Sequence, residues 1–240
     1  MLSEIYTKTG HASHNSILAT DVAKIVHFLH SQGWTPATSS NFSYRLEPGG
    51  ESAAGFAISV SGLDKADFDA TDFLDVDPDG HPLALSSNPN NSDPLMRPSA
   101  EVLLHAAVYR HYANAHTVLH THSVNGAVLS LLNETAGSLN ICGFEILKAF
   151  AGIQSHAETL HLPIFANSQD MVALSTQVAQ TLQAYTAQTD AKPVHGFMLA
   201  GHGLYAWGET PAQAKRHIEA FEYLFDCLLK LKSHGHTHAF

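Results

Sequence analysis

The stretch GFMLAGHGLYAWG, residues 196–208, predicts two strands joined by a sharp bend. Apolar residues fill both halves, and Gly201 and Gly203 flank His202 at the bend. Glycine lets a backbone turn sharply or come close to another group. A further strand is predicted at HTVLHTH, residues 116–122, because β-branched residues favour strands. The two segments together predict a sheet that carries histidines on one strand and at one bend.

Helical patterns lie on both sides of these segments. Apolar residues from Leu18 to Leu29 recur every three or four positions, and Gly33 follows as a stop signal. Further helices are predicted over about 99–113, 124–132, 171–185 and from 211 onward, with Ser99, Ser123 and Thr210 as N-caps.

A strand is predicted over 55–62, and the proline-rich segment 77–98 is either a loop over a sheet edge or a domain linker. We expect one α/β domain over 1–240, a three-layer α/β/α sandwich around a mixed, mostly antiparallel sheet. The polar stretch 1–16 and the histidine-rich tail 233–240 would be peripheral.

The composition excludes several classes of protein. The 240 residues hold 12 Lys plus Arg against 22 Asp plus Glu, a net charge of −10, which argues against nucleic-acid binding. The two cysteines cannot build a disulfide framework and fit a reducing cytosol. No apolar run approaches about 18 residues, and the N-terminus lacks the apolar core of a signal peptide. We therefore expect a cytoplasmic enzyme or binding protein that contacts no membrane.

Three of the 18 histidines form a candidate metal site. His120 and His122 lie two residues apart on a predicted strand, so their side chains share one face about 6–7 Å apart. His202, at the glycine-flanked bend, is the best candidate for a third ligand. Three imidazoles with an open fourth position are typical of catalytic zinc. The alternative is a pair of half-buried histidines bonded to backbone carbonyls, and the remaining histidines are interpreted as surface, packing or tail residues.

Two glutamates are candidates for acid–base chemistry. Glu101 is expected in the first turn of its helix, where the helix dipole lowers a carboxyl pKa. Glu145 lies between apolar residues in GFEIL, residues 143–147. If Glu145 is buried, its pKa rises towards the range that suits a general acid or base. The residues alone do not decide between the two.

Three turns of small residues are candidates for holding an anion. Backbone N–H groups and hydroxyls at loop or helix starts are typical of phosphate sites, and nearby cations would assist. No Walker A or G-x-G-x-x-G pattern is present, which disfavours a nucleotide cofactor. The candidates are Ser40 and Asn41 in the first turn, Ser61 and Gly62 in the second, Ser99 in the third, and Lys65 and Arg97 as cations.

The order RPSAEVLLHAAVY (97–109), LHTHS (119–123), GHGLYAWG (201–208) resembles the class II sugar-phosphate aldolase/epimerase superfamily. Within it, four further segments resemble the methylthioribulose-1-phosphate dehydratases of methionine salvage. The likeness extends from about residue 18 to 232. The four segments are GWTPATSSNFS (33–43), GFEILKAF (143–150), PIFANSQDM (163–171) and GETPAQAKRHIEAFEYLFD (208–226).

This resemblance implies a homotetramer with sites near subunit boundaries and one Zn²⁺ per subunit on His120, His122 and His202. It assigns the acid–base role to Glu101 in the aldolases and to the match of Glu145 in the dehydratases. The phosphate site of the superfamily matches Ser40, Asn41, Ser61, Gly62 and Ser99. Its usual Gly-Asn is Ser40-Asn41 here, and serine tolerates a positive φ less well than glycine.

The resemblance implies dehydration of 5-methylthioribulose 1-phosphate to 2,3-diketo-5-methylthiopentyl 1-phosphate. Two alternatives stay open: a fuculose- or rhamnulose-type sugar-phosphate aldolase, and a non-catalytic metal-binding protein. Candidate apolar residues for the methylthio end of the substrate are Phe144, Ile146, Phe150 and Tyr205.

Overall fold

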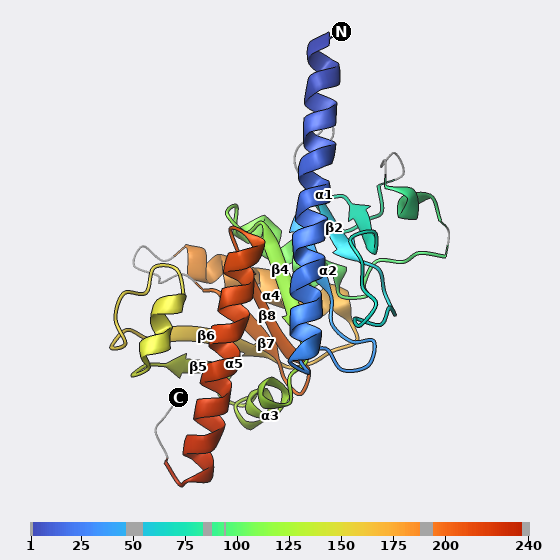
Figure 1. Ribbon diagram of the computed structural model, residues 1–240. Coiled ribbons are helices and arrows are strands. Elements are labelled where there is room, and N and C mark those ends of the chain that lie inside the picture. Colours follow the sequence, from blue (N-terminus) through green and yellow to red (C-terminus); the bar gives the residue numbers. More distant parts are fainter. Residues whose placement is uncertain (1, 47–54, 84–87, 94, 188–193, 237–240) are drawn as a thin grey trace.

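The computed structural model describes residues 2–46, 55–83, 88–93, 95–187 and 194–236, which contain an eight-stranded sheet (Figure 1). The strand order is β3-β2-β1-β4-β8-β7-β6-β5, and only β6 and β7 are parallel neighbours. The expected mixed, mostly antiparallel sheet is therefore confirmed. The strands are β1 (Phe42–Arg45), β2 (Phe56–Ser59), β3 (Phe73–Val76), β4 (Thr117–Thr121), β5 (Ser138–Ile141), β6 (Leu160–Phe165), β7 (Gly196–Leu199) and β8 (Gly203–Gly208).

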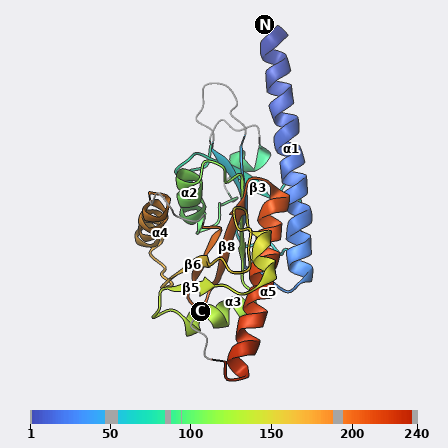
Figure 2. The same cartoon turned by 90° about the vertical axis from the view of Figure 1, so that its left-hand side faces the viewer.

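Helices cover both faces of the sheet. Helices α2 and α4 lie on one face and α1 and α5 on the other (Figure 2). One apolar core therefore lies on each side of the sheet, as in a three-layer sandwich. The helices are α1 (Leu2–Ser31), α2 (Val102–His111), α3 (Val124–Leu132), α4 (Met171–Thr186) and α5 (Pro211–Ser233), with 3₁₀ turns η1 (Pro89–Ser92) and η2 (Glu145–Ala149).

The helix starts agree with the sequence in two of three predicted caps. Ser123 accepts from the Gly126 N–H at the start of α3, and Thr210 accepts from the Gln213 N–H at the start of α5. The prediction for Ser99 is wrong, because α2 begins at Val102 and Glu101 is its N-cap residue. The Ser99 hydroxyl instead accepts from the Glu101 N–H at 3.2 Å. This shift leaves the Glu101 side chain free for other contacts.

Helix α1 extends further than predicted. It begins at Leu2, although the apolar pattern starts only at Leu18. No proline interrupts residues 2–31, and a helix extends at little cost once a packed turn has formed. None of the described helices is long and apolar enough to cross a lipid bilayer. Residues 237–240 of the predicted tail lie outside the described part.

The pairing of β4 with β8 places the bend beside the HxH segment. His120 pairs with Tyr205 and Thr121 with Leu204, so the loop between β7 and β8 reaches the end of β4. A Cβ at Gly203 would lie 2.0 Å from the Thr121 carbonyl oxygen. Only glycine permits so close an approach. The predicted strand, bend and strand over 196–208 are confirmed.

The segment 77–98 covers β3 at the sheet edge, as far as it is described. The Asn91 amide donates to the Asp75 carbonyl at 2.6 Å and accepts from its N–H at 2.9 Å. The Asn88 amide donates to the Phe73 carbonyl at 2.8 Å. The described part is therefore packed on the sheet, whereas residues 84–87 and 94 lie outside it.

Candidate functional site

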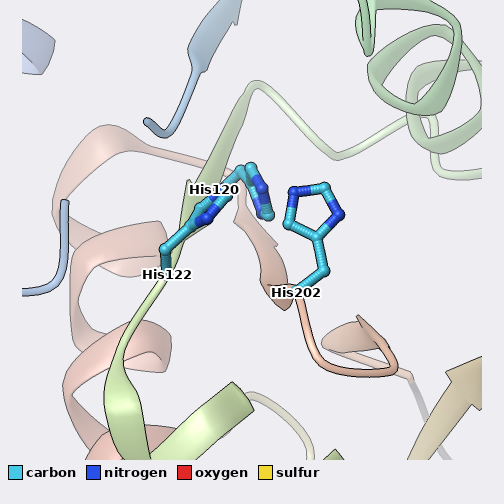
Figure 3. A group of neighbouring side chains, drawn as sticks. All are labelled: His120, His122 and His202. Atoms are coloured by element: carbon cyan, nitrogen blue, oxygen red, sulfur yellow. The ribbon is translucent and has the colours of Figure 1, made fainter. Parts of the chain in front are cut away.

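Three histidines from two neighbouring strands converge at one end of the sheet. His120 and His122 come from the end of β4, and His202 comes from the bend between β7 and β8 (Figure 3). One potential ligand atom from each lies within 4.8 Å of the other two. The ring centroids are 4.5–5.0 Å apart. The structure thus brings together the three residues that the spacing singled out.

The chemistry of this cluster fits a metal ion. His120 Nδ1 lies 3.0 Å from the Leu204 carbonyl oxygen, which only accepts, so Nδ1 carries the hydrogen. Its Nε2 therefore presents a lone pair, and that buried atom has no hydrogen-bond partner in the described chain. Burial lowers the pKa of His120 far below its usual value and that of His122 to about 4. Neutral imidazoles of this kind are good metal ligands.

The carboxylate of Glu101 lies directly beside the histidines. Its Oε1 is 3.0 Å from His202 Nε2, and its Oε2 is 3.5 Å from His120 Nε2. The Tyr205 hydroxyl and the Asn41 amide donate to Oε2 at 2.7 and 2.5 Å. Burial alone would raise the pKa of Glu101, but His120, His202 and Tyr205 outweigh it and hold that pKa well below its usual range. Glu101 is thus an ionised, oriented proton acceptor.

Glu145 lies in very different surroundings. Its side chain is 70% exposed at the start of η2, where it pairs with Lys148 and lies 3.7 Å from His156 Nδ1. The hydrogen bond from Lys148 lowers its pKa. The expectation of a buried Glu145 with a raised pKa is therefore wrong. Its apolar neighbours pack against the core, Leu147 fully, and the carboxylate turns outward.

Among the described residues, none of the contacts of the three histidines involves Glu145. The catalytic role of Glu145 stays a prediction from the resemblance.

The three turns of small residues surround one cavity of about 180 Å³ beside His122 and Glu101. Ser40 has φ +74° and Gly62 has φ +82°, so the serine adopts the strained conformation expected of it. The Ser40 hydroxyl is buried and has no partner among the described atoms. The lining contains all five residues predicted for the anion site: Ser40, Asn41, Ser61, Gly62 and Ser99.

The two predicted cations lie differently. The Lys65 side chain is buried, and its ammonium donates to the carbonyls of Leu63 at 2.7 Å and Thr38 at 3.5 Å. It therefore links Thr38, which lines the cavity, to Leu63, which follows the second turn. Arg97 is exposed and donates to the Met96 carbonyl, and its side chain does not line the cavity. Its backbone carbonyl accepts from the Ser61 N–H at 3.0 Å.

The sequence does not reveal the roles of Tyr205 and His105 in the site. Tyr205 stacks on the His120 ring at 3.9 Å and is fully buried, so it does not form an open methylthio pocket. Phe150 is also buried and packs on His217. His105 hydrogen-bonds to Asn41, whereas the sequence indicates only a surface or packing histidine there. Its position four residues after Glu101, on the same helix face, was the available signal.

A larger cavity of about 470 Å³ lies at the opposite end of β8, around His195, Trp207 and His217. Burial lowers the pKa of His195 to about 3 and that of His217 to about 4, so both are neutral. It contains neither the histidine cluster nor a carboxylate placed like Glu101. The smaller cavity therefore has the chemistry of an active site.

Comparison with known proteins agrees with this geometry. Residues 20–229 match the family described as class II aldolase and adducin N-terminal domain. A methylthioribulose-1-phosphate dehydratase of Stenotrophomonas maltophilia is 44% identical over 211 residues, covering 88% of this chain and 89% of that protein. One from Xanthomonas oryzae is 45% identical over 210 residues, covering 88% and 84%.

Solved structures are similar in fold at lower identity. YgbL of Escherichia coli has a TM-score of 0.68 at 23% identity and covers 90% of each chain. The L-fuculose-1-phosphate aldolase of Thermus thermophilus has a TM-score of 0.65 at 22% identity, covering 91% of this chain and 96% of that one. Both likenesses concern the fold alone.

Proposed function

Because this chain belongs to the class II aldolase and adducin family, and within it to the methylthioribulose-1-phosphate dehydratases, we propose that it is a hydro-lyase of methionine salvage. It dehydrates 5-methylthioribulose 1-phosphate to 2,3-diketo-5-methylthiopentyl 1-phosphate. One observation supports this function most directly: three histidines, Glu101 and a small cavity suited to an anion lie next to one another. The relatives supply the identity of the substrate.

The metal is Zn²⁺, one per chain, held by His120, His122 and His202. The buried Nε2 of His120, which lacks a hydrogen-bond partner among the described residues, supports this set, as does the neutral state of the His120 and His122 rings. When bound there, the ion would polarise the substrate's C2 ketone and stabilise the negative charge that develops on its oxygen.

The chain's own residues bind the phosphate and move the proton. Ser40, Asn41 and Ser61 offer hydroxyl and N–H donors around the cavity, and Lys65 supplies positive charge next to Thr38 of the lining. A carboxylate removes the proton from C3 and returns it to the hydroxyl leaving from C4, so that one water is lost. The resulting enol tautomerises to the diketone.

The position of Glu101 supports it as a proton acceptor, because Tyr205 and Asn41 orient its carboxylate beside the histidines. Glu145 is proposed as a second acid–base residue on the resemblance alone. The homotetrameric assembly is proposed on the same ground, and the cytoplasmic location on the two cysteines and the polar N-terminus.

One incubation tests the reaction. Purified, zinc-loaded protein is mixed with 5-methylthioribulose 1-phosphate, and we expect the absorbance of the diketone to appear. A released triose would instead indicate an aldolase. That alternative has one observation in its favour, because Glu101 of the Pro-Ser-x-Glu motif lies at the cluster. The absence of both products would contradict both activities.

A further inference from the structure

A continuous chain of hydrogen bonds, most of them buried, extends from Glu101 on the side away from the three histidines. The Asn41 amide nitrogen lies 2.5 Å from Glu101 Oε2, and its amide oxygen lies 2.5 Å from His105 Nε2. His105 Nδ1 lies 2.6 Å from the Ser43 hydroxyl, which lies 2.7 Å from the Tyr109 hydroxyl. The chain links β1 and α2 and ends at the carboxylate.

The chemistry of the partners gives every link one direction. His105 is fully buried, and this burial lowers its pKa to about 3, so its ring is neutral and carries one hydrogen. The Asn41 amide oxygen only accepts, which places that hydrogen on Nε2. His105 Nδ1 must then accept from the Ser43 hydroxyl, and the Ser43 oxygen accepts from Tyr109. All donors therefore point towards Glu101.

The Glu101 carboxylate can only accept, and it requires the same orientation of the Asn41 amide as the Nε2–H of His105 does. If the amide turned over, its oxygen would face Glu101 Oε2, and two acceptors would meet without a hydrogen between them. The N–H of His105 would then face the amide's own N–H₂ group. Unpaired buried polar groups are unfavourable, so the carboxylate and His105, with its hydrogen on Nε2, together stabilise one orientation of the amide.

Asn41 also contacts both the anion cavity and β4, the strand that carries His120. It lines the anion cavity, and its backbone carbonyl accepts from the His120 N–H at 3.0 Å. Among the described residues, the structure gives its amide nitrogen one acceptor, Glu101, so a second hydrogen is available to an anion in the cavity. One amide orientation thus serves both the carboxylate and the anion.

We propose that His105, held by Ser43 and Tyr109, is a positioning residue that fixes the Asn41 amide, so that this amide orients Glu101 and donates to the substrate phosphate. The phosphate part rests on the proposed function. His105 touches neither substrate nor metal in this arrangement and acts through Asn41.

Two substitutions of His105 separate this role from simple packing. In His105→Gln, the new amide can donate to Asn41 and accept from Ser43, so the polarity of the chain is kept. In His105→Leu, a side chain of similar size fills the space without either bond. We expect His105→Leu to lose roughly 10- to 100-fold in kcat, as outer residues of metal sites do, and His105→Gln to stay within about threefold of wild type. Zinc content should remain one per chain in both.

A second readout does not depend on dehydration. The affinity of the zinc-loaded protein for inorganic phosphate, measured by calorimetry, should fall roughly tenfold in His105→Leu and hardly change in His105→Gln. If wild type fails to dehydrate the substrate but this pattern holds, the proposed function is wrong and the positioning role stands. If dehydration occurs and the two folded variants behave alike in both measurements, the positioning role is overturned.

Ser43→Ala keeps the test decisive if His105→Leu does not fold. Without the Ser43 hydroxyl, His105 Nδ1 loses its donor and the ring can carry its hydrogen on either nitrogen. We expect kcat and phosphate affinity to fall roughly three- to tenfold. Values within twofold of wild type for this variant would overturn the proposal.

Discussion

Glu101 lies at the N-terminus of α2 among histidines and hydrogen-bond donors, whereas Glu145 lies on the surface at the start of η2 beside a lysine. Both carboxyls have a lowered pKa, for different reasons. At Glu101, neighbouring polar groups overcome burial. At Glu145, an exposed hydrogen bond from Lys148 lowers the pKa without any burial. The shift alone therefore does not identify a catalytic carboxylate, and its surroundings do.

The largest expected effect comes from the histidines that contact each glutamate. His202→Ala removes a proposed metal ligand and should lower both zinc content and kcat, the latter by about 10³-fold or more. His156→Ala removes the histidine beside Glu145 and should change kcat by less than about threefold. Zinc content is measured by metal analysis and kcat by steady-state kinetics, for both variants. Full zinc content in His202→Ala would contradict the assignment of the metal site.

The two glutamates themselves give the next effect. Glu101→Gln keeps the shape of the side chain but removes the proton acceptor beside the cluster, so we expect a loss of about 10³-fold in kcat. Glu145→Gln should lose about 10²-fold, as the resemblance predicts for a second acid–base residue. An unchanged rate in Glu145→Gln would remove Glu145 from the mechanism and leave the proton transfers to Glu101. An unchanged rate in Glu101→Gln would overturn the assignment from geometry.

A smaller effect distinguishes the buried cation from the exposed one. Lys65→Met removes the positive charge next to Thr38 of the cavity lining and should raise KM and the dissociation constant of inorganic phosphate about tenfold. Arg97→Met, at an exposed side chain outside the cavity, should raise them at most about threefold. KM is measured by steady-state kinetics and the dissociation constant of phosphate by titration, for both variants. Equal effects would mean that Arg97 reaches the phosphate after all.

Much of the fold and of the cluster follows from short patterns. The HxH strand, the glycine-flanked bend and two of three helix caps are local features, and the sequence states them directly. That His202 meets His120 depends on the pairing of β4 with β8, which no local pattern contains. The sequence offers His202 as the third ligand because glycines flank it, and the resemblance implies the same set of three.

The errors concern surroundings that depend on packing. The apolar residues around Glu145 predict a buried side chain. In the 3₁₀ turn, however, these neighbours pack inward while the glutamate points outward. The sequence offers Tyr205 as one of four candidates for a methylthio pocket, and nothing in it shows that this ring stacks on His120. The partners of His105 come from β1, about 60 residues earlier in the chain, so only the folded structure reveals them.

A third glutamate sharpens the comparison, because it is buried like Glu101 but the causes of its pKa shift include no histidine. Glu222 on α5 is 4% exposed, and burial raises its pKa to about 7, partly opposed by the hydroxyls of Ser123 and Thr121. Since the usual value is 4.5, the folded protein binds this proton more tightly than the unfolded chain does. The free energy of unfolding therefore falls as pH rises from about 4.5 through 7, by up to about 3 kcal/mol from this group.

The smallest effect on catalysis is expected in Glu222→Gln, which removes this titration and keeps the shape of the side chain. Wild type and variant should have similar urea midpoints at pH 5, where Glu222 is mostly protonated. At pH 8 the variant should be the more stable of the two, because wild type then carries an unpaired buried charge. Comparing the two proteins at each pH cancels the titration of the histidines, which they share. An equal difference at both pH values would mean that Glu222 is ionised throughout, and that burial alone does not separate it from Glu101.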